Sequence, residues 1–583
     1  SPRAAGSTEV MTSPNGEASA FPWRAFLFSG LAYLVLAIAY TWPLAVHMST
    51  GMLNEIDAQD GYEQIWVIAW VQHALATAPT HLVDAPIFYP TRGVLAYQDH
   101  MTPLAVLLYP VQWLSHNPLV VYNVGIILAF PFTALAMYPL AWHLCGDGRA
   151  AFLAGIIAAY SPYRERHIVH LNQSSAEGVP LIIWTFERAR ARGGAGWWLA
   201  FAGSLFLCST LSNYYLGYTV LGLGVYSLVL LVRRRPLVTR QSFRGIWALG
   251  LGLAPLVLVL LPYVHVQQTV GGERSLQDVV YFSADVRDFL HAGPESLLYG
   301  WTDKLWHIPP LTVEVYLFPG WLALALLTIG VWRLRAPRPA PIEAMRGRAI
   351  AYAQTTLALG VLTLGPYLRL FGTLTHVALP YMAVYFWLPG FSGFRDVGRV
   401  DQILTVFLAG AASIGAARLL RRLSSRTARK ALLALTVILI LEYGVIQKPL
   451  FPVASGGAIP PVYKWLANQP TGVLLELPIC GLPGQPCLEE STYMYYSTYH
   501  WHPLVNGGGG FFPADWSRRI APLQSFPSPA ADAMIKQLGV RYVVAHPDFP
   551  RYSEAKRFCM RSNSCSGYRR IQFGGDIAFV VEP

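Results

Sequence analysis

The sequence predicts a polytopic α-helical membrane protein, with about 11–13 transmembrane helices, that ends in an extracytoplasmic α/β domain. Hydrophobic residues make up 54% of the 583 residues and charged residues only 13%, whereas about 25% of residues are charged in an average soluble protein. Apolar stretches of roughly 20 residues, the length that spans a bilayer, recur between residues 23 and 447. After residue 447 the chain becomes more polar, and short β-rich runs replace these stretches.

The basic residues are grouped in a way that is typical of cytoplasmic loops. The net charge of +11 could point to a nucleic-acid partner, but a nucleic-acid interface needs a continuous basic patch. Here the arginines instead fall in short runs between apolar stretches, which favours a membrane topology and makes nucleic-acid binding a poor interpretation. These runs are Arg188, Arg190 and Arg192; Arg233–Arg235; Arg333, Arg335 and Arg338; and Arg418–Lys430.

The predicted order along the chain begins with a disordered cytoplasmic tail over residues 1–22, followed by a membrane domain over residues 23–447. Phe26–Val46 is the first span, and the acidic loop 47–100 after it is placed outside. Segments 101–115 and 375–388 are short and are expected to re-enter the membrane. About eleven crossings then put the N-terminus inside and the C-terminal domain outside. The remaining spans are expected at 118–144, 150–163, 174–187, 196–211, 213–232, 246–266, 313–333, 349–371, 401–418 and 431–447.

Within the acidic outer loop, Gly61–Ala78 has apolar residues at helical spacing. Trp66 and Trp70 are four residues apart and would share one helical face. This spacing predicts a helix that lies flat in the membrane interface, with both indoles in the headgroup layer.

Residues 448–583 are predicted to form a separate soluble domain. The runs VLLELP (473–478) and VRYVVAH (540–546) indicate strands, and 460–467 and 530–538 indicate helices. An aromatic run at 491–507 and the glycines at 507–510 are typical of a surface that packs on something or binds sugar-like ligands.

The cysteines support an oxidising compartment for this domain. Cys480 with Cys487, and Cys559 with Cys565, form two close pairs, which suggests local disulfides. Free thiols remain an alternative. The spacing of these cysteines and of His500 and His502 does not fit the usual zinc patterns.

Several motifs follow one another along the chain. They are DGYEQIWVIAW after the first span, FYPTRGVLAYQDHM in the same loop, SPYRERHIVHLNQ (161–173), LSNYY (211–215), VEVYLFPG (313–320), FRDVGR (394–399), and YMYYSTYHWHPLVNG followed by LGVRYVV. In their order and in the side of the membrane on which they are predicted to lie, these motifs together resemble those of a bacterial branch of the GT-C superfamily of integral-membrane glycosyltransferases. The resemblance covers most of the chain.

The resemblance implies an enzyme of the cell envelope, in the bacterial cytoplasmic membrane, that takes a sugar from a polyprenyl-phosphate carrier on the outer leaflet. Members use an aspartate of the first outer loop as the base for the acceptor. Asp60 matches that position best and Asp57 is the fallback. A carboxylate there could accept the proton that an attacking hydroxyl must lose, and a single displacement would invert the anomeric centre. The acceptor, whether glycan, lipid or protein, is not specified.

A departing phosphate needs positive charge to meet it. Arg395 and Arg399 are the favoured contacts for the donor phosphate, with His167 and His170 lining the cavity. Further candidates for substrate binding are Arg164, Glu314, and the pair Asp99 and His100, which could orient an acceptor or hold a divalent cation.

Simpler interpretations stay open for several of these residues. Asp60 could cap the helix that follows it, and Asp99 could be a turn residue. Arg164, Arg166, Arg395 and Arg399 could anchor lipid headgroups. Glu314 could be solvated at the outer end of a span.

Two other functions remain possible from the sequence. A transporter or flippase of a lipid-linked or polar substrate would predict internal repeats, and none is found between the two halves. A non-catalytic subunit of an envelope complex would use its C-terminal domain for contact. Walker A, GxSxG and HExxH motifs are absent from the sequence, so ATPase, serine hydrolase and zinc protease functions lack support.

Overall fold

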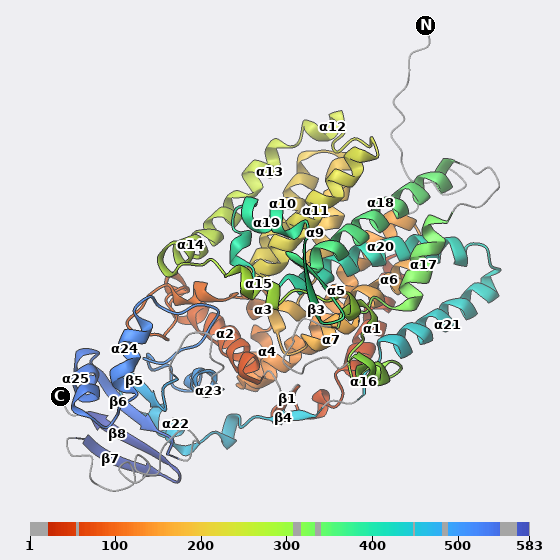
Figure 1. The fold of residues 1–583 in the computed structure, drawn as a ribbon. Helices are drawn as coiled ribbons and strands as arrows, with labels where there is room; N and C mark the ends of the chain where they lie inside the picture. Colours follow the sequence, from red (N-terminus) through yellow and green to blue (C-terminus); the bar gives the residue numbers. More distant parts are fainter. Residues whose placement is uncertain are drawn as a thin grey trace.

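Figure 1 shows the computed structural model, in which a large helical part carries a small sheet domain at one end. The structure describes residues 21–53, 58–306, 316–332, 340–446, 449–480, 488–547 and 568–581. The predicted tail 1–22 therefore lies almost wholly outside the described residues.

The helical part contains long helices joined by short helical turns. Its helices are α1 (Trp23–Tyr40), α2 (Ala58–Thr77), α3 (Thr102–Leu107), α4 (Tyr109–Ser115), α5 (Pro118–Cys145), α6 (Gly148–Ala159), α7 (Pro162–Arg166), α8 (Leu171–Ser174), α9 (Gly178–Arg192), α10 (Ala195–Leu211), α11 (Asn213–Val232), α12 (Arg240–Phe243), α13 (Trp247–Gly252), α14 (Ala254–Val270), α15 (Leu276–Tyr281), α16 (Asp303–Trp306), α17 (Trp321–Val331), α18 (Ala340–Thr363), α19 (Tyr381–Trp387), α20 (Val400–Leu420) and α21 (Ser425–Tyr443). Two antiparallel ladders accompany them, β1 (Gly51–Leu53) with β4 (Leu450–Pro452) and β2 (Tyr367–Leu370) with β3 (Thr373–Ala378).

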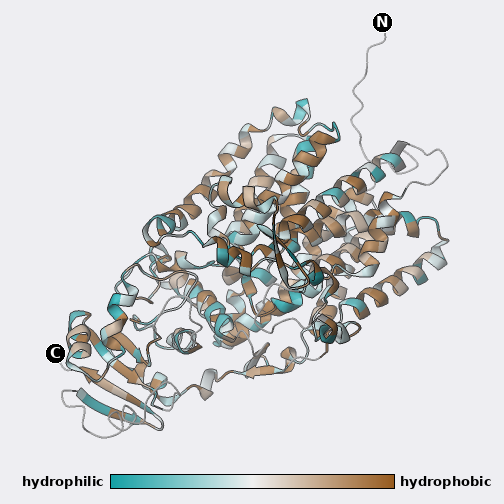
Figure 2. Ribbon diagram, in the orientation of Figure 1, coloured by the Kyte–Doolittle hydropathy of each residue, from teal (hydrophilic) through white to brown (hydrophobic). Residues whose placement is uncertain are grey.

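The fold confirms a multi-helical membrane protein. Among the described residues, four helices are long and apolar enough to cross a bilayer: α1, α5, α11 and the helix from Val397 to Leu420 that contains α20. Shorter apolar helices are α6, α10, α14 and α17. Figure 2 shows the apolar colour running through the helical part.

A helix lies in every segment that was predicted to cross, but some boundaries differ. The predicted C-terminal end of the span 349–371 is wrong, because α18 already ends at Thr363. Pro366 follows three residues later and cannot continue a helix. Segment 101–115 divides into α3 and α4, and segment 375–388 divides into β3 and α19. None of these pieces is long enough to span, as the sequence predicts for both segments.

The local sequence explains the hairpin of α5 and α6. Asn117 caps α5 by accepting from the backbone N–H of Leu119, and Gly146 ends it in the left-handed region at φ 62°. Asp147 then caps α6 by accepting from the backbone N–H of Arg149. The Asp147 carboxylate also pairs with the Arg149 guanidinium at 2.8 Å, which fixes the turn.

Within the residues that the structure describes, the C-terminal domain has a four-stranded sheet and the four helices α22–α25. Its order is β5-β6-β8-β7, with β5 and β6 parallel and the other neighbours antiparallel. The predicted strands and helices of this domain are confirmed. The elements are α22 (Pro461–Leu466), β5 (Val473–Leu477), α23 (Leu488–Ser497), α24 (Trp516–Leu523), α25 (Pro529–Gln537), β6 (Val540–Ala545), β7 (Tyr568–Phe573) and β8 (Asp576–Val581).

The prediction that α2 lies in the membrane interface is wrong. Trp66 is fully buried and Trp70 is 9% exposed. The indole N–H of Trp66 donates to Ser497 Oγ at 3.2 Å, and that of Trp70 donates to the carbonyl of Leu82 at 2.9 Å. Helix α2 packs on α23 of the C-terminal domain, which the sequence could not reveal because the two helices are far apart in the chain.

We expect Trp66→Ala to lower the free energy of unfolding by roughly 3–5 kcal/mol, because it empties a buried indole site and removes the bond to Ser497. Thermal unfolding of the purified protein in detergent measures this. Trp113→Ala is the control, since Trp113 is 68% exposed. Equal losses for both variants would contradict the assigned packing of α2.

Cys145 and Cys208 are buried free thiols. Cys487, Cys559 and Cys565 lie outside the described residues. The two disulfide pairings therefore stay predictions.

Candidate functional site

The centre of the site is a pair formed by Asp60, in the first turn of α2, and His170, which precedes α8. His170 Nε2 lies 2.7 Å from Asp60 Oδ2, and 42% of the Asp60 side chain is still exposed. The interpretation of Asp60 as a helix cap is wrong, because α2 already begins at Ala58. An acidic side chain in the first turn still interacts favourably with the helix dipole.

Close packing next to Asp60 brings the two residues together. A Cβ on Gly61 would lie only 2.7 Å from Met52 Sδ and 3.0 Å from Val169 Cγ2. Glycine therefore permits α2 to approach the segment that ends in His170. The Tyr122 hydroxyl donates to the carbonyl of Val169 at 2.6 Å and holds that segment in place.

The charges around Asp60 favour its ionised form. Burial alone would raise the pKa of Asp60, but the hydrogen bond and the charge of His170 lower it. The positive charges of Arg399 and Arg395 act in the same direction, so the pKa lies below its ordinary value. Asp60 is thus a carboxylate at neutral pH.

Arg395 and Arg399 lie on the turn that leads into α20. Both pair with Asp396, at 3.3 Å from Arg395 Nε and 2.9 Å from Arg399 Nη2. The Arg395 guanidinium lies over Phe282 and that of Arg399 over Tyr214, at 4.7 and 4.1 Å from the ring centroids. These contacts orient the two guanidinium groups, and 41% of the Arg395 side chain stays exposed.

Asp99 belongs to the same region through Asn172, two residues after His170. Asn172 Nδ2 donates to Asp99 Oδ2 at 2.9 Å, and Asn213 donates to Asp99 Oδ1 from its backbone N–H at 3.0 Å and from Nδ2 at 3.1 Å. His100 Nδ1 lies 2.6 Å from the hydroxyl of Thr102, and burial lowers the pKa of this histidine. Because amide N–H groups occupy both oxygens of Asp99, the arrangement does not fit a cation ligand.

Glu63 is a member of the site that the sequence interpretation missed. It lies one helical turn after Asp60, and burial together with the charges of Asp60 and Asp99 raises its pKa to about 8. Glu63 is therefore mostly protonated at neutral pH and can donate a hydrogen bond. The spacing of three residues from Asp60 is the signal that could have identified it.

Arg164 is a buried residue that holds neighbouring segments of the site together. It is 2% exposed and donates to Thr133 Oγ1 at 2.8 Å and to the carbonyl of Ser174. These bonds tie the α7–α8 segment to α5. They exclude headgroup anchoring for Arg164 and do not favour a contact with substrate.

The other predicted residues are placed as follows. His167 is 2% exposed, and its ring lies 5.7 Å from that of His170. Arg166 is also buried, which excludes headgroup anchoring. Asp57 and Glu314 lie outside the described residues, so their roles stay predictions. Within the described ranges, no group of three or more His, Cys, Asp or Glu residues is placed to hold a metal ion.

The C-terminal domain borders this region through its glycine-rich loop. Arg274 Nη2 donates to the carbonyl of Gly510 at 2.7 Å, and its guanidinium lies 4.8 Å from the centroid of Phe511. A Cβ on Gly509 would lie 3.5 Å from the side chain of Gln98, the residue before Asp99. The loop 47–100 and the C-terminal domain therefore meet beside the site.

Comparison with known proteins identifies solved structures that have a similar fold. No protein-family model and no curated protein matches the sequence. Two cryo-EM classes of a mutant of the arabinofuranosyltransferase AftD from mycobacteria match with TM-scores of 0.56 and 0.57 at 14% and 13% identity, over 97% of this chain and 42% of AftD. ArnT from Cupriavidus metallidurans bound to undecaprenyl phosphate matches with a TM-score of 0.45 at 14% identity, over 97% of this chain and 100% of ArnT.

This chain thus spans less than half the length of AftD. At such identities the likeness to AftD concerns the fold alone. The chain therefore shares its overall fold with the arabinofuranosyltransferase AftD, in agreement with the helical membrane part and the small C-terminal domain that its sequence predicts.

Proposed function

We propose that the protein transfers a sugar from a polyprenyl-phosphate donor to an acceptor hydroxyl on the outer face of a bacterial cytoplasmic membrane. The supporting observation is that an ionised, accessible carboxylate, Asp60, lies within electrostatic reach of two oriented arginines, Arg395 and Arg399. This combination suits a reaction in which one partner loses a proton and the other departs as a phosphate. The N-terminus is then cytoplasmic and the C-terminal domain is outside.

Asp60 acts as the general base in this proposal. His170 holds Oδ2, and Oδ1 accepts the proton of the acceptor hydroxyl. The acceptor oxygen then forms a bond to the anomeric carbon. The bond between that carbon and the phosphate oxygen breaks on the opposite face, so the configuration inverts.

Arg395 and Arg399 receive the departing phosphate. The phosphate oxygen keeps the electron pair of the broken bond, and two guanidinium groups stabilise the negative charge that forms. Their pairing with Asp396 and their stacking on Phe282 and Tyr214 hold them in place before the donor arrives.

The direct test measures sugar transfer by the purified protein in proteoliposomes, with a radiolabelled polyprenyl-phosphate sugar as donor. A glycosylated acceptor and released polyprenyl phosphate are the expected products. Movement of the intact donor between leaflets without cleavage would contradict the proposal and support a flippase.

The pH dependence of transfer tests the role of Glu63. With a pKa of about 8, Glu63 is neutral below that pH and ionises above it. Ionisation adds a negative charge beside Asp60 and Asp99 and would oppose the donor phosphate, so we expect transfer to fall as the pH rises through about 8. Glu63→Gln should remove this alkaline limb and keep the rate at pH 7. An unchanged limb in that variant would contradict the assignment, provided that both proteins unfold at similar temperatures.

A further inference from the structure

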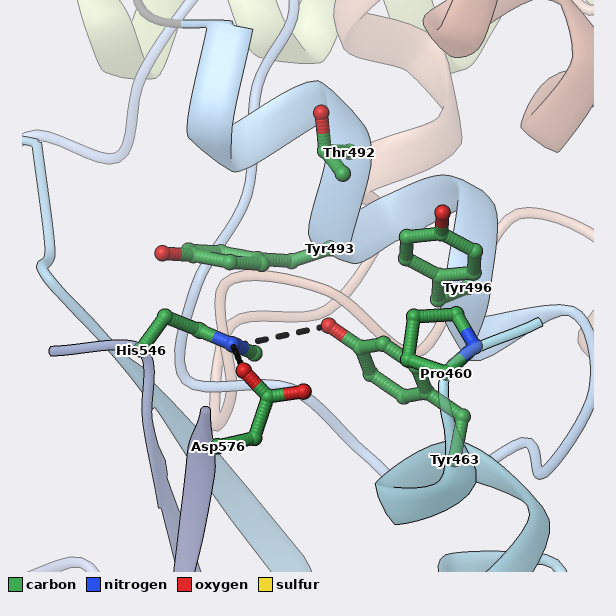
Figure 3. A pocket seen from close by; sticks show the side chains of 7 residues that line it. All are labelled: Pro460, Tyr463, Thr492, Tyr493, Tyr496, His546 and Asp576. Carbon is green, nitrogen blue, oxygen red and sulfur yellow. Dashed lines mark hydrogen bonds and ion pairs between the residues drawn. The ribbon is translucent and has the colours of Figure 1, made fainter. Parts of the chain in front are cut away.

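The C-terminal domain contains a cavity of about 360 Å³ that is separate from the Asp60 site. Figure 3 shows the side chains around it, which come from α22, α23 and the ends of β6 and β8. This volume lies at the lower end of the range for small-molecule sites, about 300–1,000 Å³. The lining residues are Pro460, Tyr463, Thr492, Tyr493, Tyr496, His546 and Asp576.

Two pairs of flat rings line the cavity. Tyr463 and Tyr496 are stacked with centroids 4.4 Å apart at 19°, and Tyr493 and His546 are stacked at 5.3 Å and 16°. Thr492 lies above the space between them in Figure 3. Aromatic walls with polar tips suit a ligand that has both C–H faces and hydroxyl groups.

A buried ion cluster forms the floor. His546 Nε2 lies 2.9 Å from Glu476 Oε2, and Nδ1 lies 2.8 Å from Asp576 Oδ1. Burial alone would lower the pKa of His546, but the hydrogen bonds to Asp576 and Glu476 raise it to about 9. Each ring nitrogen of the resulting imidazolium donates to a carboxylate. The histidine therefore holds Glu476 and Asp576 in place and has no ring N–H left to donate to a ligand.

Asp576 is the carboxylate that faces the ligand space. Its side chain is 22% exposed, whereas Glu476 is fully buried and also accepts from the Tyr463 hydroxyl at 2.8 Å. In Figure 3 the second carboxylate oxygen of Asp576 points away from His546. Two carboxylates against one imidazolium disfavour a phosphate or another anion, whereas a carboxylate oxygen accepts well from sugar hydroxyls.

We propose that this cavity is a second saccharide site, which binds a neutral sugar unit of the acceptor. The binding claim stands on the cavity alone, whereas the assignment to the acceptor rests on the proposed function. The donor is a membrane lipid and must reach Arg395 and Arg399, whereas this cavity lies in the sheet domain, away from α20 (Figure 1).

Helix α23 provides a physical connection between the two sites. Its Tyr493 and Tyr496 line the cavity, while Ser497 bonds to Trp66 of α2, the helix that carries Asp60. A glycan held on one side of α23 would therefore be positioned relative to the base on the other. Such remote binding raises the effective concentration of the reacting hydroxyl.

The test measures binding of neutral methyl pentosides and methyl hexosides to the full-length protein by saturation-transfer NMR and calorimetry, with methyl glucuronide as the anionic comparison. We expect the neutral glycosides to bind and the glucuronide to bind at least about tenfold more weakly. Asp576→Asn should weaken neutral binding about tenfold, and Thr492→Phe, which fills the cavity, should abolish it.

Asp532→Asn is the matched control, because Asp532 lies in the same domain but bonds to Tyr568 outside the cavity. It should bind sugar as the wild type does. Equal sugar binding by the wild type and by Thr492→Phe, or no binding by the wild type, would overturn the saccharide site.

Two further results separate this inference from the proposed function. Asp60→Asn should keep the neutral sugar binding even where transfer is lost. Thr492→Phe should raise KM for an acceptor of several sugar units and leave KM for a single-unit acceptor unchanged. Sugar binding without any transferase activity would contradict the proposed function alone, and unchanged KM for both acceptors would contradict the acceptor role alone.

Discussion

Asp60→Asn is expected to reduce the rate of sugar transfer by about 10²- to 10⁴-fold, the usual contribution of a positioned general base. The amide cannot take the proton of the acceptor hydroxyl, yet it has nearly the same shape and can still accept a hydrogen bond from His170. Donor binding should therefore change little. Initial rates at saturating donor, together with donor binding to the purified variant, measure both effects.

Asp84→Asn provides the matched control for this experiment. Asp84 belongs to the same loop, 47–100, but its carboxylate accepts from the backbone N–H of Gly93 at 3.0 Å and lies 3.3 Å from the ring of His81. Its variant should transfer sugar at close to the wild-type rate. Full transfer by Asp60→Asn would remove the assignment, and loss of transfer in Asp57→Asn instead would move the base to Asp57.

The double variant Arg395→Ala and Arg399→Ala is expected to lose about 10²- to 10³-fold in kcat/KM for the donor, the size seen when a charge-stabilising donor is removed from a reacting centre. Arg399→Lys should keep part of the activity, because it keeps the charge but loses the planar fork that contacts Asp396 and Tyr214.

Arg240→Ala serves as the control for loss of one exposed arginine, since Arg240 lies in α12 and not in the site. Thermal stabilisation by added undecaprenyl phosphate gives a readout that does not depend on catalysis. We expect this stabilisation to be weaker in the double variant than in the wild type. Equal stabilisation of both proteins would contradict a phosphate contact by these arginines.

The membrane helices could be predicted because their signal is local. A stretch such as Pro118–Cys145 is apolar over its whole length, and that length alone indicates a crossing. The strands at Val473–Leu477 and Val540–Ala545 carry the same kind of local signal, a short apolar and β-branched run.

The position of α2 could not be predicted, because its partner is remote in the sequence. Its tryptophans have the spacing of an interfacial helix, and only contact with Ser497 and the rest of α23 buries them. Burial by a distant partner leaves no periodic signal in the helix itself.

The residues of the site could be predicted in part, but their packing and protonation could not. Asp60 was named from the resemblance to the GT-C superfamily, and His170, Arg395 and Arg399 from residue type and predicted side of the membrane. The structure brings these residues together across more than 300 residues of chain. The pairing of Asp60 with His170 depends on packing at Gly61, which no motif encodes. Glu63 was missed because its protonation arises from the surrounding burial and charge.

The contact between α2 and α23 also has a consequence for the order in which the protein matures. Helix α2 emerges early during synthesis, yet the residues that cover its tryptophans lie in the 488–497 segment and emerge hundreds of residues later. The pairing of β1 with β4 closes the same long loop. Helix α2, which bears Asp60, can therefore reach its final packing only after the segment 488–497 has been made. If Asp60, Arg395 and Arg399 act as proposed, a nascent chain that stalls before that point would hold the two arginines without a positioned base, and so would not consume a lipid-linked donor.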